Sequence, residues 1–186
     1  MPGGPEIVSI LSYYLVNMEY FILKNIIQGV VSFVDDMDRK ILRCLQEDAS
    51  LPVSEIADRV GLSNTPCWRR VQNLEKAGVI RRRVALLDAE KLNVGVTVFV
   101  RVKTNQHSYD WLEGFAKAVA EIDEVVEFYR MSGDIDYLLR IVVPDIAGYD
   151  RVYKRLIKAA GLSDVSSSFA MEQIKYTTAL PLHYTP

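Results

Sequence analysis

The chain contains 186 residues, of which 49% are hydrophobic and 25% are charged, and its formal net charge is −2. This length allows one sizeable domain or two small ones, and the composition is that of an ordinary globular protein with a buried core. A net charge so close to zero excludes a uniformly basic surface, so binding to a polyanion would depend on local clusters of charge. The two cysteines, which lack CxxC spacing, and the two isolated histidines argue against a disulfide framework or a zinc site and are typical of the reducing cytoplasm.

Residues 1–34 form a strongly apolar N-terminal extension that Glu19 and Lys24 interrupt. The uncharged stretch before Glu19 is shorter than the roughly 18 to 20 residues of a membrane-spanning helix, which disfavours a membrane anchor. The segment also lacks the basic start and the cleavage site of a secretory signal. Two other interpretations stay open: a helix that packs on the body of the protein or on a partner, and sequence upstream of a translation start at Met18 or Met37.

Three helices are predicted between residues 35 and 78. Residues 35–48 place apolar side chains at helical spacing behind aspartates that suit a helix N-terminus. Residues 53–60 form a second amphipathic segment, and Gly61 after it is a typical end of a helix. The third helix is expected to begin after Ser63, a common N-cap residue, and to end at Gly78.

A tight glycine turn between the last two helices is typical of a helix-turn-helix, whose final helix enters the major groove of DNA. Cys67, Val71 and Leu74 recur at i, i+4 and i+7 and predict the buried face of that helix. Arginine can read guanine, and asparagine or glutamine can read adenine, so the base-reading candidates are Asn64, Thr65, Arg69, Gln72 and Asn73. Phosphate contacts, which confer affinity but no sequence choice, are expected from Arg70, Lys76, Arg81, Arg82 and Arg83.

The distribution of charge supports this interpretation. Residues 59–83 carry seven basic side chains and one acidic side chain, Glu75. The alternative is a three-helix bundle whose basic face is merely solvated surface. Trp68 also has two interpretations, which are packing against the first helix and contact with a base or sugar of DNA. Cys67 is interpreted as a small core residue.

A different pattern follows residue 78. Residues 79–88 are expected to form a short strand or hairpin, a wing beside the third helix. Further on, β-branched and aromatic runs predict strands, and amphipathic spacing predicts helices. The strands cover 94–104, 124–133, 136–143 and 165–182, and the helices cover 109–122 and 145–161. The order β-α-β-β-α-β is the ferredoxin-like arrangement, so the fold class is α+β.

The predicted strands over 94–102 and 137–143 are apolar along more of their length than two helices on one face of a sheet would cover. The sheet of a second protomer could cover the rest, which favours an obligate homodimer. The alternative is a larger core within a single chain.

Three stretches carry specific motifs: GLSNTPCWRRVQNLEKAGVIRRRVALLD, MSGDIDYLLRIVVPDIAGYDRVYKRL and SSFAMEQIKYTTALPL. Together they resemble the Lrp/AsnC family, the feast/famine transcriptional regulators of bacteria and archaea, and the resemblance covers residues 35–183. It implies a winged helix-turn-helix DNA-binding domain over 35–82 and a hairpin linker over 83–95. It further implies an effector-binding and oligomerisation domain, the RAM domain, over 96–183. Family members pair their sheets in dimers that assemble into tetramers or octamers.

The resemblance also implies an amino-acid effector that binds between these domains. By position, the effector residues would be Met131, Ser132, Gly133, Asp134 and Asp136, with Ser167 and its neighbours Ser166 and Ser168 as weaker candidates. Glycine lets backbone N–H groups approach a carboxylate, and an aspartate can accept a hydrogen bond from an ammonium group. The alternative is a plain hairpin turn, in which Gly and Asp are favoured for backbone reasons.

The sequence therefore predicts a sequence-specific DNA-binding transcriptional regulator, located in the cytoplasm, that responds to an amino acid. The alternative function is an architectural DNA-wrapping protein that needs no effector. An enzyme is disfavoured because the sequence offers no nucleophile–base pair, no metal-ligand spacing and no phosphate-binding loop. No cofactor is expected apart from the small-molecule effector.

Overall fold

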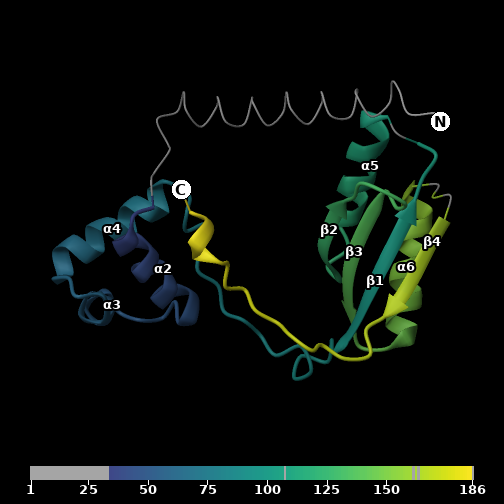
Figure 1. Ribbon diagram of the computed structural model, residues 1–186. Coiled ribbons are helices and arrows are strands. Elements are labelled where there is room, and N and C mark those ends of the chain that lie inside the picture. The colour runs from purple at the N-terminus through teal and green to yellow at the C-terminus, as the bar shows by residue number, and fades with distance from the viewer. Residues whose placement is uncertain (1–33, 107, 161, 163, 186) are drawn as a thin grey trace, which may run out of the picture. The chain divides into compact units, whose positions relative to one another are not determined.

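The computed structural model describes residues 34–106, 108–160, 162 and 164–185, so the open interpretations of the N-terminal extension lie outside the described residues, apart from Val34. The described chain divides into two compact units (Figure 1). Residues 34–85 together with 177–185 form the first unit, and residues 86–176 form the second. None of the helices formed by the described residues is long and apolar enough to cross a membrane.

The first unit contains three helices, as predicted: α2 (Asp36–Glu47), α3 (Val53–Val60) and α4 (Asn64–Lys76). Asp35 is the N-cap of α2, and its side chain accepts a hydrogen bond from the backbone N–H of Asp38. Gly61 ends α3 in the left-handed conformation, with φ at 75°, which glycine adopts without steric cost. Ser63 is the N-cap of α4, although its side chain makes no capping hydrogen bond.

The three helices enclose a small apolar core. The predicted inner face of α4 is confirmed, because Cys67, Val71 and Leu74 are almost completely buried. They pack with Ile41 and Leu42 of α2 and with the buried side chains of α3, which are Ile56, Ala57 and Val60. Burial raises the pKa of the Cys67 thiol, so this side chain is a neutral core group, as expected.

The strand or hairpin expected over residues 79–88 is not formed in the described chain. Residues 81–93 are exposed and lie in no helix or strand, and they end in a tight turn in which the N–H of Val94 donates to the carbonyl of Ala89. A strand is stable only when a neighbouring strand pairs with its backbone groups, and the described sheet of this chain contains β1 to β4 alone. The apolar pattern was therefore insufficient to predict pairing.

The second unit has the predicted β-α-β-β-α-β order. Its elements are β1 (Val96–Lys103), α5 (Tyr109–Ala120), β2 (Val125–Arg130), β3 (Tyr137–Val143), α6 (Ile146–Ala160) and β4 (Asp164–Phe169). The four strands form one antiparallel sheet in the order β2-β3-β1-β4 (Figure 1). The predicted ferredoxin-like fold and the α+β class are confirmed.

The two faces of this sheet differ. Alternate residues of β1 and β3, such as Val100 and Leu139, are fully buried and pack with Phe115 of α5 and Leu156 of α6. The intervening residues lie on the opposite face, where Phe99 of β1 is 38% exposed. Since successive side chains of a strand point to opposite faces, one face forms the core with the helices. The other, here called the open face, contributes no side chain to that core.

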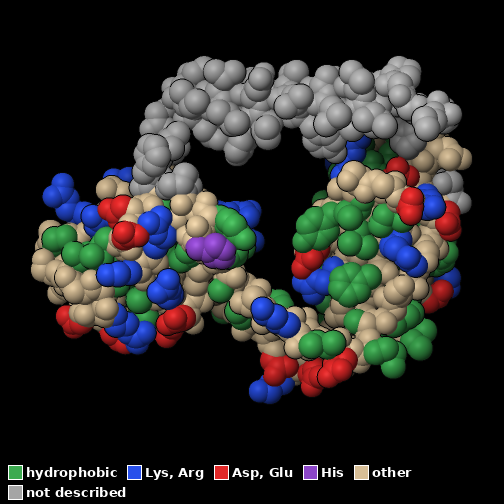
Figure 2. All heavy atoms as spheres, viewed as in Figure 1, with side chains coloured by type: hydrophobic (Ala, Val, Ile, Leu, Met, Phe, Trp, Pro, Cys, Tyr) green, Lys and Arg blue, Asp and Glu red, His purple; other side chains and the backbone are tan. Residues whose placement is uncertain are grey.

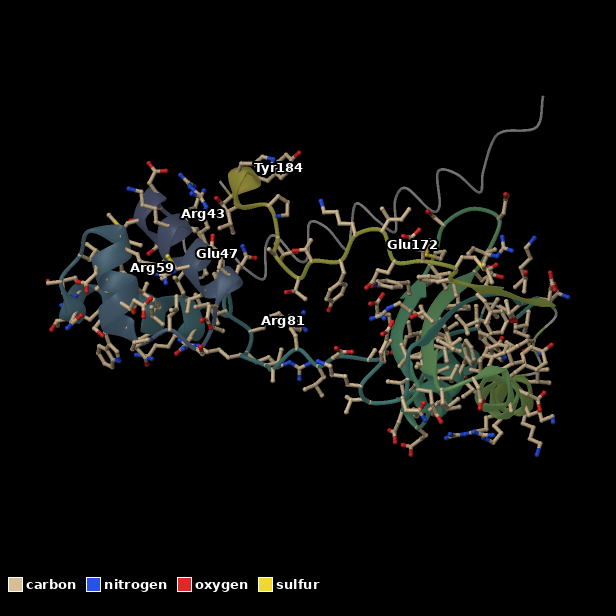
Figure 3. The ribbon with its side chains drawn as sticks, turned by 90° about the horizontal axis from the view of Figure 1, so that it is seen from below. Arg43, Glu47, Arg59, Arg81, Glu172 and Tyr184 are labelled. Atoms are coloured by element: carbon tan, nitrogen blue, oxygen red, sulfur yellow. The ribbon has the colours of Figure 1, made fainter. Side chains whose placement is uncertain are left out.

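The final strand is shorter than expected. β4 ends at Phe169 instead of continuing to residue 182, and residues 170–181 are exposed and lie in no helix or strand. The chain then joins the first unit through a short 3-10 helix, η1 (Leu182–Tyr184), beside α2 (Figure 3). Leu182 packs against the apolar core, and the Gln46 side chain exchanges two hydrogen bonds with the backbone of Leu180. Arg39 donates to the hydroxyl of Thr185 at 2.9 Å.

This docking predicts that the C-terminal segment stabilises the first unit. Replacing Leu182 by Ala removes a partly buried side chain, so we expect a loss of about 1 to 2 kcal/mol, below the range for a fully buried leucine. Thermal unfolding of the full chain, followed by circular dichroism, measures the effect. Leu180→Ala is the matched control, since that side chain is 72% exposed. Equal melting temperatures for the two variants would contradict the prediction.

Candidate nucleic-acid interface and effector loop

The surface of α4 carries the proposed DNA contacts. Because Cys67, Val71 and Leu74 face inward, the other sides of the helix lie at the surface. The predicted contact residues of α4 that are exposed are Asn64, Thr65, Trp68, Arg69, Asn73 and Lys76. Figure 2 shows that Lys and Arg side chains lie among acidic ones over the visible face of the first unit.

Trp68 lies outside the core. Its side chain is 53% exposed, so the indole is available at the surface of α4. It lines an open groove of about 350 Å³ together with Val53 and Ser54 of α3 and with Asn64 and Thr65 of α4. The indole is therefore accessible, as the interpretation of Trp68 as a contact residue requires.

The basic residues of α4 and of the segment after it differ in their partners. Within the described part of the chain, no ion pair involves Arg69, Lys76, Arg81 or Arg82, and all four are exposed. Arg81 extends from the segment that leaves α4 (Figure 3). Arg83 instead pairs with Glu75 at 3.1 Å.

Glu75 organises two of the predicted contact residues. One carboxylate oxygen accepts from Arg83, and the other accepts from the Gln72 amide at 2.9 Å. The single acidic residue of the basic segment is thus an intramolecular acceptor, and it engages Gln72 and Arg83 within the unit.

Arg70 is placed differently from its neighbour Arg69. Its Nη1 atom donates to Asp35 Oδ2 at 2.7 Å and to Asp38 Oδ1 at 2.8 Å. The two carboxylates raise the pKa of the Arg70 guanidinium. The pKa of Asp35 is lowered, chiefly by the backbone N–H of Asp38 and further by Arg70. The structure therefore ties the predicted phosphate contact Arg70 to the start of α2.

The predicted effector loop, residues 131–136, connects β2 and β3. The N–H of Met131 donates to the carbonyl of Asp136 at 2.8 Å and closes the loop. Gly133 has φ at 117°, a conformation that only glycine adopts readily. Met131, Ser132, Gly133 and Asp134 are exposed at the tip of the hairpin.

The two aspartates of this loop have different environments. Asp136 Oδ2 accepts the backbone N–H of Thr104 at 2.8 Å, and the Asp136 N–H donates to the carbonyl of Val102. Asp136 therefore fastens the loop to the end of β1. Asp134 is exposed, so its carboxylate is the better placed of the two to meet a ligand.

The structure does not bring Ser167 to this loop. Ser167 lies on β4 and pairs with Val100 of β1, so β1 separates it from β3. Its hydroxyl is hydrogen-bonded to the Tyr149 hydroxyl, on the side of the sheet that faces the helices. Ser166 lies on the open face, where its hydroxyl accepts from Arg101 at 3.0 Å. Ser168 is exposed and pairs with Phe99.

Sequence reasoning missed the partners that set these roles. Asp35 and Asp38 hold Arg70, Thr104 holds Asp136, and Tyr149 holds Ser167. Only the first pair had a signal, because aspartates spaced three residues apart at a helix start suggest reciprocal capping. Within the residues that the structure describes, no group of three or more His, Cys, Asp or Glu is arranged to hold a metal ion.

A helix-turn-helix unit joined to a separate ligand-binding-type α+β unit defines a two-domain transcriptional regulator. Residues 34–81 match the family model of a winged helix-turn-helix DNA-binding domain, and residues 97–180 match that of the Lrp/AsnC ligand binding domain. The chain belongs to the Lrp/AsnC family of transcriptional regulators.

Characterised relatives and solved structures agree with this assignment. The glutamate uptake regulatory protein of Zymomonas mobilis is 50% identical over 82% of this chain and 93% of its own length. The transcriptional activator DecR of Escherichia coli is 51% identical over 80% of this chain and 99% of its own. An AsnC family regulator from Agrobacterium tumefaciens has a TM-score of 0.80 and 64% identity, covering 82% of this chain and 99% of that one. A regulator from Neisseria meningitidis, solved as a complex with L-Met, has a TM-score of 0.76 and 39% identity, covering 80% and 97% of the two chains.

Proposed function

We propose that this chain is a sequence-specific transcriptional regulator of the cytoplasm that binds double-stranded DNA through α4 and responds to an amino acid, and that it has no enzymatic activity. The observation that carries the proposal is the two-sided character of α4. One side is buried with Cys67, Val71 and Leu74, and the others present exposed polar and basic side chains that no described ion pair occupies.

The exposed residues divide by chemistry into two roles. Asn64 and Thr65, in the first turn of α4, and Arg69 and Asn73 further along are placed to reach base edges in the major groove. Trp68 borders the same surface and contacts a sugar or a thymine methyl group. Phosphate contacts come from the exposed cations Lys76, Arg81 and Arg82. Gln72 and Arg83 contribute only if their hydrogen bonds to Glu75 rearrange on binding.

A homodimer is part of the proposal. The open face of the sheet carries Phe99 and Tyr129, which are 38% and 50% exposed, beside a Glu127–Arg140 ion pair. A second copy of this face would bury these rings, and the dimer would carry two α4 helices for the two half-sites of a pseudo-palindromic DNA sequence. Dimers of this kind assemble further into tetramers or octamers.

The effector would bind at the tip of the β2–β3 hairpin. An α-amino acid presents a carboxylate and an ammonium group. Because Gly133 has no side chain, the backbone N–H groups of the turn would be open to the carboxylate, and Asp134 would accept a hydrogen bond from the ammonium group. The Neisseria relative solved with L-Met supports an amino acid as the class of ligand. Effector binding changes DNA occupancy by favouring one assembly over another.

Arg69→Ala tests base reading. The variant should lose more binding free energy on a specific duplex than on a scrambled one, because only the specific duplex offers the matching base edge. We expect the two losses to differ by about 1 to 3 kcal/mol. Gel-shift titrations on both duplexes measure it. Arg82→Ala is the control, since loss of a phosphate contact weakens both complexes equally. An equal loss on both duplexes for Arg69→Ala would remove it from the base-reading residues.

Asp134→Ala tests the effector site. We expect the response to the amino acid to disappear while DNA affinity without effector stays unchanged, because the ammonium acceptor is lost from an exposed turn. A thermal-shift screen of the twenty amino acids identifies the effector, since a ligand that binds the folded state raises the melting temperature. Calorimetry with that amino acid then measures binding. Asp123→Ala, an exposed aspartate of the same unit, is the control. Unchanged effector binding in Asp134→Ala would reject the assignment.

Phe99→Glu tests the dimer. A carboxylate in the centre of the open face should shift the chain towards monomers, because the interface would have to remove it from water, and it would compete with Glu127 for Arg140, the cross-strand partner of residue 99. Sedimentation velocity at several concentrations measures the shift. Tyr109→Glu, which alters an exposed ring at the start of α5, should leave the assembly unchanged. A wild-type chain that is monomeric throughout would refute the dimer directly.

A further inference from the structure

In the polar contact between α4 and α2, every oxygen of two carboxylates has a hydrogen-bond donor. A single guanidinium nitrogen, Arg70 Nη1, donates to Asp35 Oδ2 at 2.7 Å and to Asp38 Oδ1 at 2.8 Å. The remaining oxygens form the reciprocal cap of α2, in which Asp35 Oδ1 accepts the N–H of Asp38 at 2.8 Å and Asp38 Oδ2 accepts the N–H of Asp35 at 3.3 Å. All four carboxylate oxygens therefore have a donor, and each aspartate divides its two oxygens between its own helix and Arg70.

Burial makes this contact costly to break. The side chain of Asp38 is only 12% exposed, and that of Arg70 is 35% exposed. A carboxylate that is largely removed from water needs a cation and hydrogen-bond donors in fixed positions. Since Arg70 is the cation that meets Asp38, the position of Arg70 relative to the start of α2 is fixed to within the tolerance of two short hydrogen bonds.

The apolar contacts of α4 do not fix its orientation as closely as the hydrogen bonds of Arg70 do. Cys67, Val71 and Leu74 form a row along one side of the helix, and the hydrophobic effect that buries them is non-directional, so it leaves the rotation of α4 about its axis less sharply defined than a hydrogen bond would. Hydrogen bonds are directional, so the Arg70 contact removes that freedom. Arg69 precedes Arg70, and Asn73 lies three residues after it, so their direction from the helix changes whenever α4 rotates.

We propose that Arg70 is a positioning residue for DNA recognition and makes no phosphate contact, and that with Asp35 and Asp38 it fixes the orientation in which α4 presents its base-reading side chains. This inference rests on the proposed entry of α4 into the major groove. It assigns a role in specificity to two acidic residues that would themselves be repelled by DNA.

Removing a negative charge near α4 distinguishes a positioning role from an effect of net charge on DNA affinity. Asp38→Asn makes the domain more positive, so an effect through net charge would strengthen binding to every duplex. A positioning role predicts the reverse for specific DNA, because the Arg70 contact is weakened and α4 loses its fixed orientation. Asp58→Asn, at an exposed residue of α3, is the matched control for charge alone.

The experiment uses the full chain, a duplex that the wild-type protein enriches from a random library, and a scrambled duplex of the same composition. Binding of wild type, Arg70→Gln, Arg70→Lys, Asp38→Asn, Asp35→Asn, Asp58→Asn and Arg82→Gln is measured at several salt concentrations. The temperature is kept well below the melting point of every variant, as checked by circular dichroism. Asp35→Asn is included because its side chain is 49% exposed, so its loss disturbs folding less than that of Asp38.

Arg70→Gln should lower the preference for the enriched duplex at least about fivefold, as expected for partial loss of base contacts. Its slope of log affinity against log salt should equal that of wild type, whereas Arg82→Gln should reduce the slope by about 0.9. Asp38→Asn and Asp35→Asn should lower the preference as Arg70→Gln does, and Arg70→Lys should restore part of it. Asp58→Asn should leave the preference unchanged.

A slope reduced by about 0.9 in Arg70→Gln would show a phosphate contact and overturn the inference. Stronger binding of Asp38→Asn to both duplexes would overturn it as well. A wild-type chain that enriches no duplex and binds neither would instead refute the proposed function, so the two failures are distinguishable.

Discussion

The burial of one row of side chains on α4 is the constraint on which the proposed DNA interface depends. Cys67, Val71 and Leu74 leave water together when α4 packs against α2 and α3, and this decides which sides of the helix remain at the surface. The polar residues between them then need no special arrangement to be exposed. The same packing explains why Cys67, a reactive residue type, is an inert part of the core.

Charge in the first unit is organised locally. The whole chain has slightly more acidic than basic residues, and three of the acidic ones pair with basic side chains of α4 or of the segment after it. Glu75 engages Gln72 and Arg83, while Asp35 and Asp38 engage Arg70. Acidic side chains therefore sort the basic ones into two groups, those that stabilise the unit and those that stay available to a polyanion.

In the second unit, too, one of two nearby acidic residues stabilises the fold and the other stays exposed. Asp136 fastens the β2–β3 loop to the end of β1, and this anchorage leaves Asp134 at the tip of a closed turn. The chain enters the sheet at β1 and leaves it from β4, and these strands are paired, with the N–H of Ala170 donating to the carbonyl of Thr97 at 2.9 Å. Both connections to the DNA-binding unit thus start from the same end of two adjacent strands, and the second one ends as part of that unit.

The sequence by itself determined the helices, the order of helices and strands along the chain, and the inner face of α4, because these follow from local periodicity, turn residues and the spacing of apolar side chains. It also indicated the contact residues of α4 as a set. Only the tertiary structure decided which members of that set are available, because the partners of Arg70 lie more than thirty residues away in the chain. The extent of strands that need a distant partner was likewise not determined by the sequence. A strand or hairpin was expected over 79–88 and a strand up to residue 182, but pairing depends on which backbone lies alongside. The different environments of Asp134 and Asp136, and the distance of Ser167 from the loop, have the same cause, since their hydrogen-bond partners come from other elements of the fold.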